Sequence, residues 1–196
     1  KAVSGHTIQI GKKRIRLVAL CALQPGQPWW DHNGVKHDGG LICKNALGHL
    51  VNGKKVRCRI YKRYGAYGRM YARCFVDGED IGKWLVRQGY AVAVPFYGKW
   101  YVRDERYARR KVNGIWRGRF SSPVEWGRQV GRQRLVEIYK KRNLGGNPDE
   151  MTLEDLMDAL KLGWEYGKLL DPMSYLVDLD FELFHDVFSF DSLSMT

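Results

Sequence analysis

Residues 5–24 read GHTIQIGKKRIRLVALCALQ, and this stretch decides the fold. Apolar and polar residues alternate on either side of Gly11-Lys12-Lys13, where the pattern breaks. A glycine at such a break suits a tight turn, so the pattern predicts a β-hairpin with strands at 6–10 and 14–20. Two more β-like runs, at 54–61 and 68–76, are separated by a glycine-rich connection.

Three helices are expected in the remainder of the first two thirds of the chain. Apolar residues at helical spacing predict helices at 40–51, 80–88 and 101–112. Each ends at a glycine or an Asn-Gly pair, which are common helix stop signals. Strands with intercalated helices predict a small α+β domain.

Charge is distributed unevenly along the 196 residues. The formal net charge is +12, but residues 144–196 hold 12 acidic residues and two basic ones, a net charge of −10. Residues 1–143 therefore carry +22. A basic body favours binding to a polyanion such as nucleic acid, and an acidic arm indicates either that it docks on this body or that it meets a different partner.

The chain changes character after residue 126, so we expect one domain at 1–126 and an extension at 127–196. A basic helix expected at 124–142 crosses this boundary and is preceded by the helix-opening pair Ser122-Pro123. Thr152 and Asp155 have the spacing of a capping box, which predicts an amphipathic helix to about residue 170. The acidic segment that follows is rich in aromatic residues, so we expect it to lie on another surface, either of this chain or of a partner.

Five short motifs occur in an order and at spacings that resemble the staphylococcal nuclease family. They are Gly5-His6-Thr7-Ile8, Arg14-Ile15-Arg16-Leu17, Tyr67-Gly68-Arg69-Met70-Tyr71-Ala72, Leu85-Val86-Arg87-Gln88-Gly89-Tyr90-Ala91 and the stretch from Glu105 to Trp116. The resemblance covers about residues 1–126. It implies a five-stranded barrel of the oligonucleotide-binding (OB) type with about three packed helices.

The resemblance also implies a set of catalytic positions, and three of them hold unexpected residues. Family members cut phosphodiester bonds with Ca²⁺ held largely by two aspartates, with a glutamate near the attacking water and two arginines on the phosphate. The aspartates fall at His6 and Cys21 and the glutamate at Gln24, whereas both arginines are kept as Arg16 and Arg69. Because Ca²⁺ requires anionic oxygen ligands, we predict that no cofactor binds and that catalysis is lost; Ca²⁺ would be the cofactor only if the chain is active.

Two further roles for these residues stay open. His6 and Cys21 could form part of a zinc or copper site if Cys43 or His37 joined them, although a packed histidine and a buried thiol are the simpler alternative. The resemblance places Tyr97 where the family keeps a nucleotide-stacking tyrosine, within a region where basic and aromatic residues interleave.

The four cysteines give a candidate disulfide framework. We favour a Cys58–Cys74 pair, with Cys21–Cys43 as a weaker candidate and buried thiols as the alternative. An even cysteine number, together with a chain that begins at Lys1 and so suggests processing, favours an extracytoplasmic (periplasmic or secreted) or organellar location. No apolar run is long enough to span a membrane.

Three functional hypotheses follow. The first is a catalytically inactive nuclease-like domain that serves as a structural or interaction subunit of a larger assembly, with residues 121–196 binding neighbouring proteins. The second is a metal-dependent phosphodiesterase that hydrolyses DNA or RNA. The third is a module that binds nucleic acid through its basic face without cleaving it.

Overall fold

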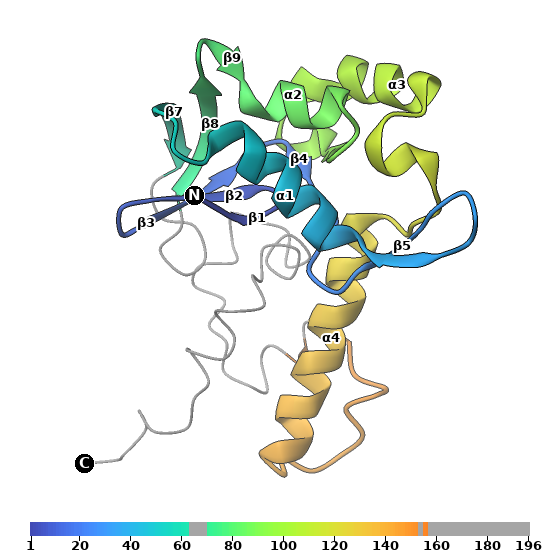
Figure 1. The fold of residues 1–196 in the computed structure, drawn as a ribbon. Coiled ribbons are helices and arrows are strands. Elements are labelled where there is room, and N and C mark those ends of the chain that lie inside the picture. Colours follow the sequence, from blue (N-terminus) through green and yellow to red (C-terminus); the bar gives the residue numbers. More distant parts are fainter. Residues whose placement is uncertain (63–69, 153–154, 157–196) are drawn as a thin grey trace. The chain divides into compact units, whose positions relative to one another are not determined.

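A computed structural model of the chain describes residues 1–62, 70–152 and 155–156 (Figure 1). The chain divides into two compact units, Lys1–Pro123 and Val124–Thr196. The boundary expected after residue 126 therefore falls just inside helix α4, Pro123–Lys141, which begins at the end of the first unit.

A twisted sheet forms the centre of the first unit, in the strand order β1-β2-β3-β8-β7. The short strand β9 extends it by pairing with β8. These strands are β1 (Ala2–Ser4), β2 (Thr7–Ile10), β3 (Lys13–Leu17), β7 (Val56–Lys62), β8 (Met70–Val76) and β9 (Glu79–Asp80). β2 and β3 form the expected hairpin, with Ile8 opposite Ile15, and β3 runs parallel to β8. The sheet and its helices confirm an α+β fold of the OB type.

The strand expected at 14–20 is wrong in its second half. β3 stops at Leu17, and Ala19 adopts a left-handed backbone with φ of 60°. A residue in that conformation cannot continue a β-ladder. The chain turns there, and Leu20–Cys21 forms β4, which pairs with β10 (Val92–Ala93) instead.

A small hairpin that the sequence did not reveal precedes the first helix. It consists of β5 (Pro28–Trp30) and β6 (Lys36–Asp38), with Trp29 opposite His37. Trp30 also exchanges backbone hydrogen bonds with Arg119, at 2.9 and 2.8 Å. The hairpin is thereby tied to the end of the first unit.

Helices pack around this sheet close to the expected positions. They are α1 (Gly39–Val51), α2 (Ile81–Arg87) and α3 (Val102–Lys111), with the 3-10 helices η2 (Pro95–Tyr97), η3 (Lys99–Tyr101) and η4 (Gly114–Arg117). Asp38 and Asp80 cap the N-termini of α1 and α2 through their side chains, which explains where these helices begin. Figure 1 shows α2 and α3 side by side.

The core of the first unit is apolar and contains three of the four cysteines, Cys21, Cys43 and Cys74. Leu17, Leu47, Ala72 and Leu85 are among its fully buried side chains. Burial of such side chains supplies most of the free energy that stabilises the fold.

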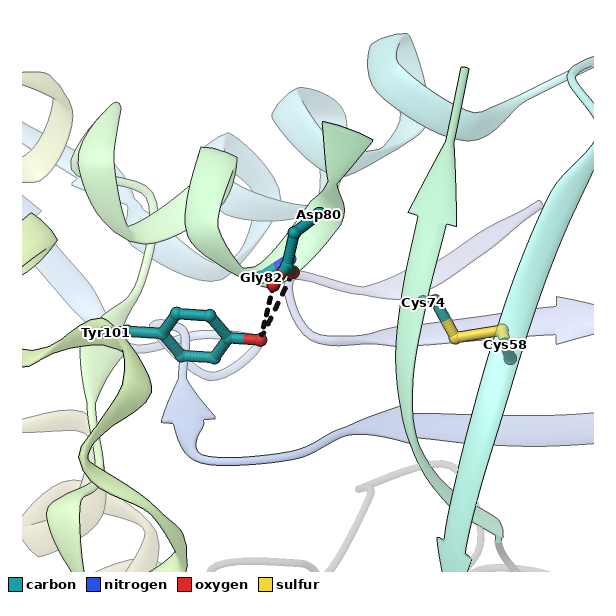
Figure 2. Close-up of a disulfide and its surroundings, with 5 residues drawn as sticks. All are labelled: Cys58, Cys74, Asp80, Gly82 and Tyr101. Atoms are coloured by element: carbon teal, nitrogen blue, oxygen red, sulfur yellow. Dashed lines mark hydrogen bonds between the residues drawn. A yellow bond between two sulfur atoms is a disulfide. The ribbon is translucent and has the colours of Figure 1, made fainter. Parts of the chain in front are cut away.

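A disulfide joins Cys58 on β7 to Cys74 on β8, the pair that the sequence favoured (Figure 2). The two residues are direct cross-strand partners with a Cα–Cα distance of 4.0 Å. Cys21 and Cys43 are both buried thiols, so the weaker candidate pair is not formed.

In the second unit, the chain after α4 returns along that helix. Arg132 donates to the backbone carbonyls of Asp149 and Met151, at 2.8 and 3.0 Å, and Lys140 pairs with the Asp149 carboxylate at 2.7 Å. The start of the acidic extension is therefore held by basic residues of α4.

The expected capping box is present in the same unit. The Asp155 amide donates to Thr152 Oγ1 at 3.1 Å, and the Thr152 amide donates to Asp155 Oδ2 at 3.0 Å. The rest of the helix predicted to residue 170 and the aromatic segment beyond it lie outside the described residues. Where the chain is described, no helix is long and apolar enough to cross a membrane.

Candidate functional site

The structure brings together the positions that the sequence singled out in the first 24 residues. The guanidinium of Arg16 on β3 donates to Cys21 Sγ at 3.8 Å. Gln24 Nε2 donates to the same sulfur at 3.5 Å. The His6 ring accepts the backbone N–H of Ala22 on Nδ1, at 3.1 Å. We call His6, Arg16, Cys21 and Gln24 the degenerate site.

All four side chains of the degenerate site are inaccessible. The relative exposure is 2% for His6, 4% for Arg16, 0% for Cys21 and 2% for Gln24. A nuclease site must admit a phosphodiester and a water molecule. The degenerate site instead resembles a packed polar core.

Two glycines explain why the degenerate site is closed so tightly. A Cβ atom on Gly5 would lie 2.6 Å from the Cβ atoms of both Ala22 and Cys43. A Cβ atom on Gly40, in the first turn of α1, would lie 2.3 Å from the carbonyl oxygen of Gln24. Only glycine permits such approaches, so the backbone beside His6 and the start of α1 both press against the segment that contains Ala22 and Gln24.

These side chains do not fit Ca²⁺. The degenerate site supplies an imidazole, a thiol, an amide and a cationic guanidinium, and none of the four is a carboxylate. Ca²⁺ binds six to eight oxygens, and its affinity depends on their charge. The imidazole nitrogen Nδ1 and the thiol are, in addition, already engaged in hydrogen bonds with protein groups.

The suggested zinc or copper partners are placed elsewhere or are unsuited to the task. His37 Nε2 lies 3.1 Å from Asp31 Oδ2 on the β5–β6 hairpin, and this hydrogen bond lowers the pKa of Asp31. Burial, reinforced by Cys21 and Asp38, raises the pKa of Cys43 to about 12, so its thiol stays protonated near neutral pH. Within the described ranges, no group of three or more His, Cys, Asp and Glu side chains could hold a metal ion.

The other two sequence candidates have different outcomes. Arg69, the second expected phosphate ligand, lies outside the described residues. Tyr97 is the last residue of η2 and is partly exposed, with its ring edge-on to the exposed ring of Phe96 at a centroid distance of 5.1 Å.

Sequence reasoning missed a buried polar network beside the sheet (Figure 2). The Tyr101 hydroxyl donates to the carboxylate of Asp80 at 3.2–3.3 Å, and Arg73 Nε donates to the same carboxylate at 2.6 Å. Asp80 Oδ1 also accepts the backbone N–H groups of Gly82 and Lys83 at the start of α2. Burial, followed by the nearby Asp80 charge, raises the pKa of Tyr101, so the phenol remains a donor. The only sequence signal was Asp80 as the first residue of the helix predicted at 80–88.

Taken together, the curled sheet, the packed helices and the polar cluster beside β3 and β4 define a small OB-type domain with the layout of a nuclease. Residues 31–118 match the family model described as "Staphylococcal nuclease homologue". This part of the chain is therefore a staphylococcal nuclease-like domain. The matched range contains Arg69 and Tyr97 and none of the degenerate site.

A similar curated protein is the succinoglycan biosynthesis protein ExoI of Rhizobium meliloti (strain 1021). It is 30% identical to the chain over 118 residues, which cover 59% of this chain and 61% of that protein. Its name assigns it to succinoglycan biosynthesis and states no reaction.

Proposed function

We propose that this chain is a catalytically inactive nuclease-like domain that serves as an interaction subunit of a larger assembly. The observation that carries the proposal is the chemistry of the degenerate site. Cys21 stands where the resemblance implies a Ca²⁺-binding aspartate, and its sulfur accepts hydrogen bonds from Arg16 and Gln24 in a buried cluster.

Two physical effects support the loss of catalysis. With neutral ligands in place of two aspartates, the affinity for Ca²⁺ falls because it depends on anionic oxygens. Gln24 cannot accept a proton from water, which removes general-base assistance worth roughly 10²- to 10⁴-fold in rate. Arg16 keeps a guanidinium but points it at a thiol, so this side chain serves packing rather than phosphate binding.

The interaction role rests on the extension. Its acidic residues begin to pair with α4 at Asp149, but most of them lie beyond this contact, in a segment rich in aromatic residues. Such a segment gains stability by covering the apolar surface of a partner. We therefore assign binding of neighbouring proteins to residues 121–196.

The disulfide supports a compartment in which thiols are oxidised. We accordingly propose an extracytoplasmic or organellar location.

Two measurements test this function. Calorimetric titration of the full chain with Ca²⁺ should give no binding up to about millimolar concentration, where a carboxylate site of moderate affinity would saturate. Purification under native conditions should recover fixed partners with the full chain, and removal of residues 144–196 should release them. A full chain that remains alone in such purifications would rule out the interaction role. Stoichiometric Ca²⁺ binding would rule out the proposal that the degenerate site has lost its affinity for Ca²⁺.

A further inference from the structure

The outward face of the β7–β8 hairpin is basic and aromatic. Along β8, Ala72, Cys74 and Val76 are buried, so the alternate residues Arg73 and Phe75 point away from the core. Their direct partners on β7 are Arg59 and Arg57, both exposed. Three arginines therefore share one face of two neighbouring strands.

Two exposed rings adjoin these arginines. The rings of Tyr61 on β7 and Trp100 on η3 lie 5.4 Å apart with an interplanar angle of 35°, and they are 48% and 42% exposed. The guanidinium of Arg59 lies 5.7 Å from the Tyr61 ring, and that of Arg73 lies 5.6 Å from the Trp100 ring. We call Arg57, Arg59, Arg73, Tyr61 and Trp100 the hairpin face.

The hairpin face carries an unfavourable charge arrangement that is built in. Arg59 and Arg73 are directly opposite, and like charges at such positions destabilise a sheet. Arg73 cannot swing away freely, because Asp80 holds its Nε at 2.6 Å and is itself held by Tyr101 and the start of α2. The Asp80 carboxylate offsets part of the Arg73 charge, and an anion bound between the two arginines would relieve the repulsion that remains.

We propose that the hairpin face binds single-stranded nucleic acid. Arg57 and Arg59 are two residues apart on one strand, a repeat of roughly 6.6–6.8 Å, which suits successive phosphates of an extended strand. Trp100 and Tyr61 offer partly exposed aromatic rings on which bases can stack without regard to sequence. An acidic peptide would satisfy the arginines but would leave the two rings without planar partners. The site includes no residue of the degenerate site and requires no catalysis.

The test uses the full chain in the presence of EDTA, with fluorescence anisotropy of a labelled oligothymidylate of about 12 nucleotides. Wild-type binding should weaken steeply as salt rises. The variant Arg57→Gln/Arg59→Gln should bind at least about tenfold more weakly, and the slope of log affinity against log salt should fall by about 1.4. The matched control, Arg106→Gln/Arg110→Gln on α3, removes the same charge from two other exposed positions and should change affinity much less.

Stacking is tested at Trp100. Trp100→Ala should weaken binding by about 5- to 150-fold, whereas Trp100→Phe, which keeps a ring, should stay close to the wild type. Far-ultraviolet circular dichroism establishes that each variant is folded. If Trp100→Ala unfolds, Trp100→Leu, which keeps apolar bulk without an aromatic ring, replaces it and should show the same weakening.

Three outcomes would overturn the proposal. The first is equal weakening by the hairpin and α3 variants, which would mean that net charge alone drives binding. The second is insensitivity to Trp100→Ala in a folded protein. The third is an oligoglutamate of equal charge that binds as tightly and with the same dependence on Trp100, which would mark the hairpin face as a protein-docking surface.

Discussion

The side-chain amide of Gln24 donates a hydrogen bond to the sulfur of Cys21 over 3.5 Å, and both residues are buried. In the arrangement that the resemblance implies, these two positions would hold the carboxylates that bind a cation and orient water. In this chain the two side chains form a hydrogen bond with each other instead. A buried contact between two neutral side chains therefore stands where the resemblance implies an open, anionic site.

Restoring the carboxylates should restore a response to Ca²⁺. In the variant His6→Asp/Cys21→Asp/Gln24→Glu, three carboxylates repel one another in a buried space, so the melting temperature in EDTA should fall below that of the wild type. Ca²⁺ should then raise the melting temperature of the variant, because it binds the folded state, and leave the wild type unchanged. Differential scanning fluorimetry measures both. A wild type that gains as much stability as the variant would contradict the account of the site.

The Cys58–Cys74 disulfide should contribute about 2–4 kcal/mol to the free energy of unfolding. Denaturant unfolding of Cys58→Ala/Cys74→Ala should show this loss. Reduction of the wild type should reproduce it, and the same reductant should have no effect on the variant, because Cys21 and Cys43 are thiols already. Sensitivity of the double variant to reductant would reveal a second disulfide.

Removal of the Asp80 side chain should lower the free energy of unfolding more than removal of any single contact that it makes. Tyr101→Phe removes one hydrogen bond and should cost about 1 kcal/mol. Asp80→Ala removes the cap of α2 as well as the partner of Arg73 and should cost about 2 kcal/mol or more. Asp77→Asn, at a carboxylate that is 75% exposed, is the control and should cost less than about 1 kcal/mol. Chemical denaturation with equal slopes for all variants makes the comparison valid.

The stabilisation that the buried Cys43 thiol provides should be lost in alkaline solution. Its pKa in the folded state is about 12, compared with an ordinary value of 9.0. Above pH 9.0 the unfolded chain loses this proton while the folded chain keeps it, so the stabilisation is complete below pH 9.0 and is lost as the pH rises toward 12. The difference in unfolding free energy between the wild type and Cys43→Ala should therefore shrink over this range. A difference that does not change with pH would show that Cys43 ionises equally in both states.

The fold could be predicted from the sequence because the signals for its turns and helix ends are local. The break at Gly11 marked the β2–β3 hairpin, and Gly89 marked the end of α2, which closes at Arg87. The convergence of Arg16, Cys21 and Gln24 followed from spacing within one segment and a resemblance of motifs. The predicted first helix began at residue 40, one residue after the observed start of α1 at Gly39, which Asp38 caps.

Features that depend on tertiary packing were not predictable. The burial of the degenerate site results from the approach of Gly40 to Gln24, which no pattern in either segment announces. The left-handed Ala19 that ends β3 carries no glycine or asparagine signal. Tyr61 and Trp100 are 39 positions apart in the sequence, so their contact could not be read from periodicity.

The loss of catalysis is tested most directly by turnover. The full chain should be incubated with single-stranded DNA, plasmid DNA and RNA, in Ca²⁺, Mg²⁺, Mn²⁺ or Zn²⁺, beside the variant Arg69→Ala purified in the same way. We predict that the wild type cleaves no faster than this variant with any metal. Metal-dependent cleavage by the wild type that Arg69→Ala abolishes would contradict it.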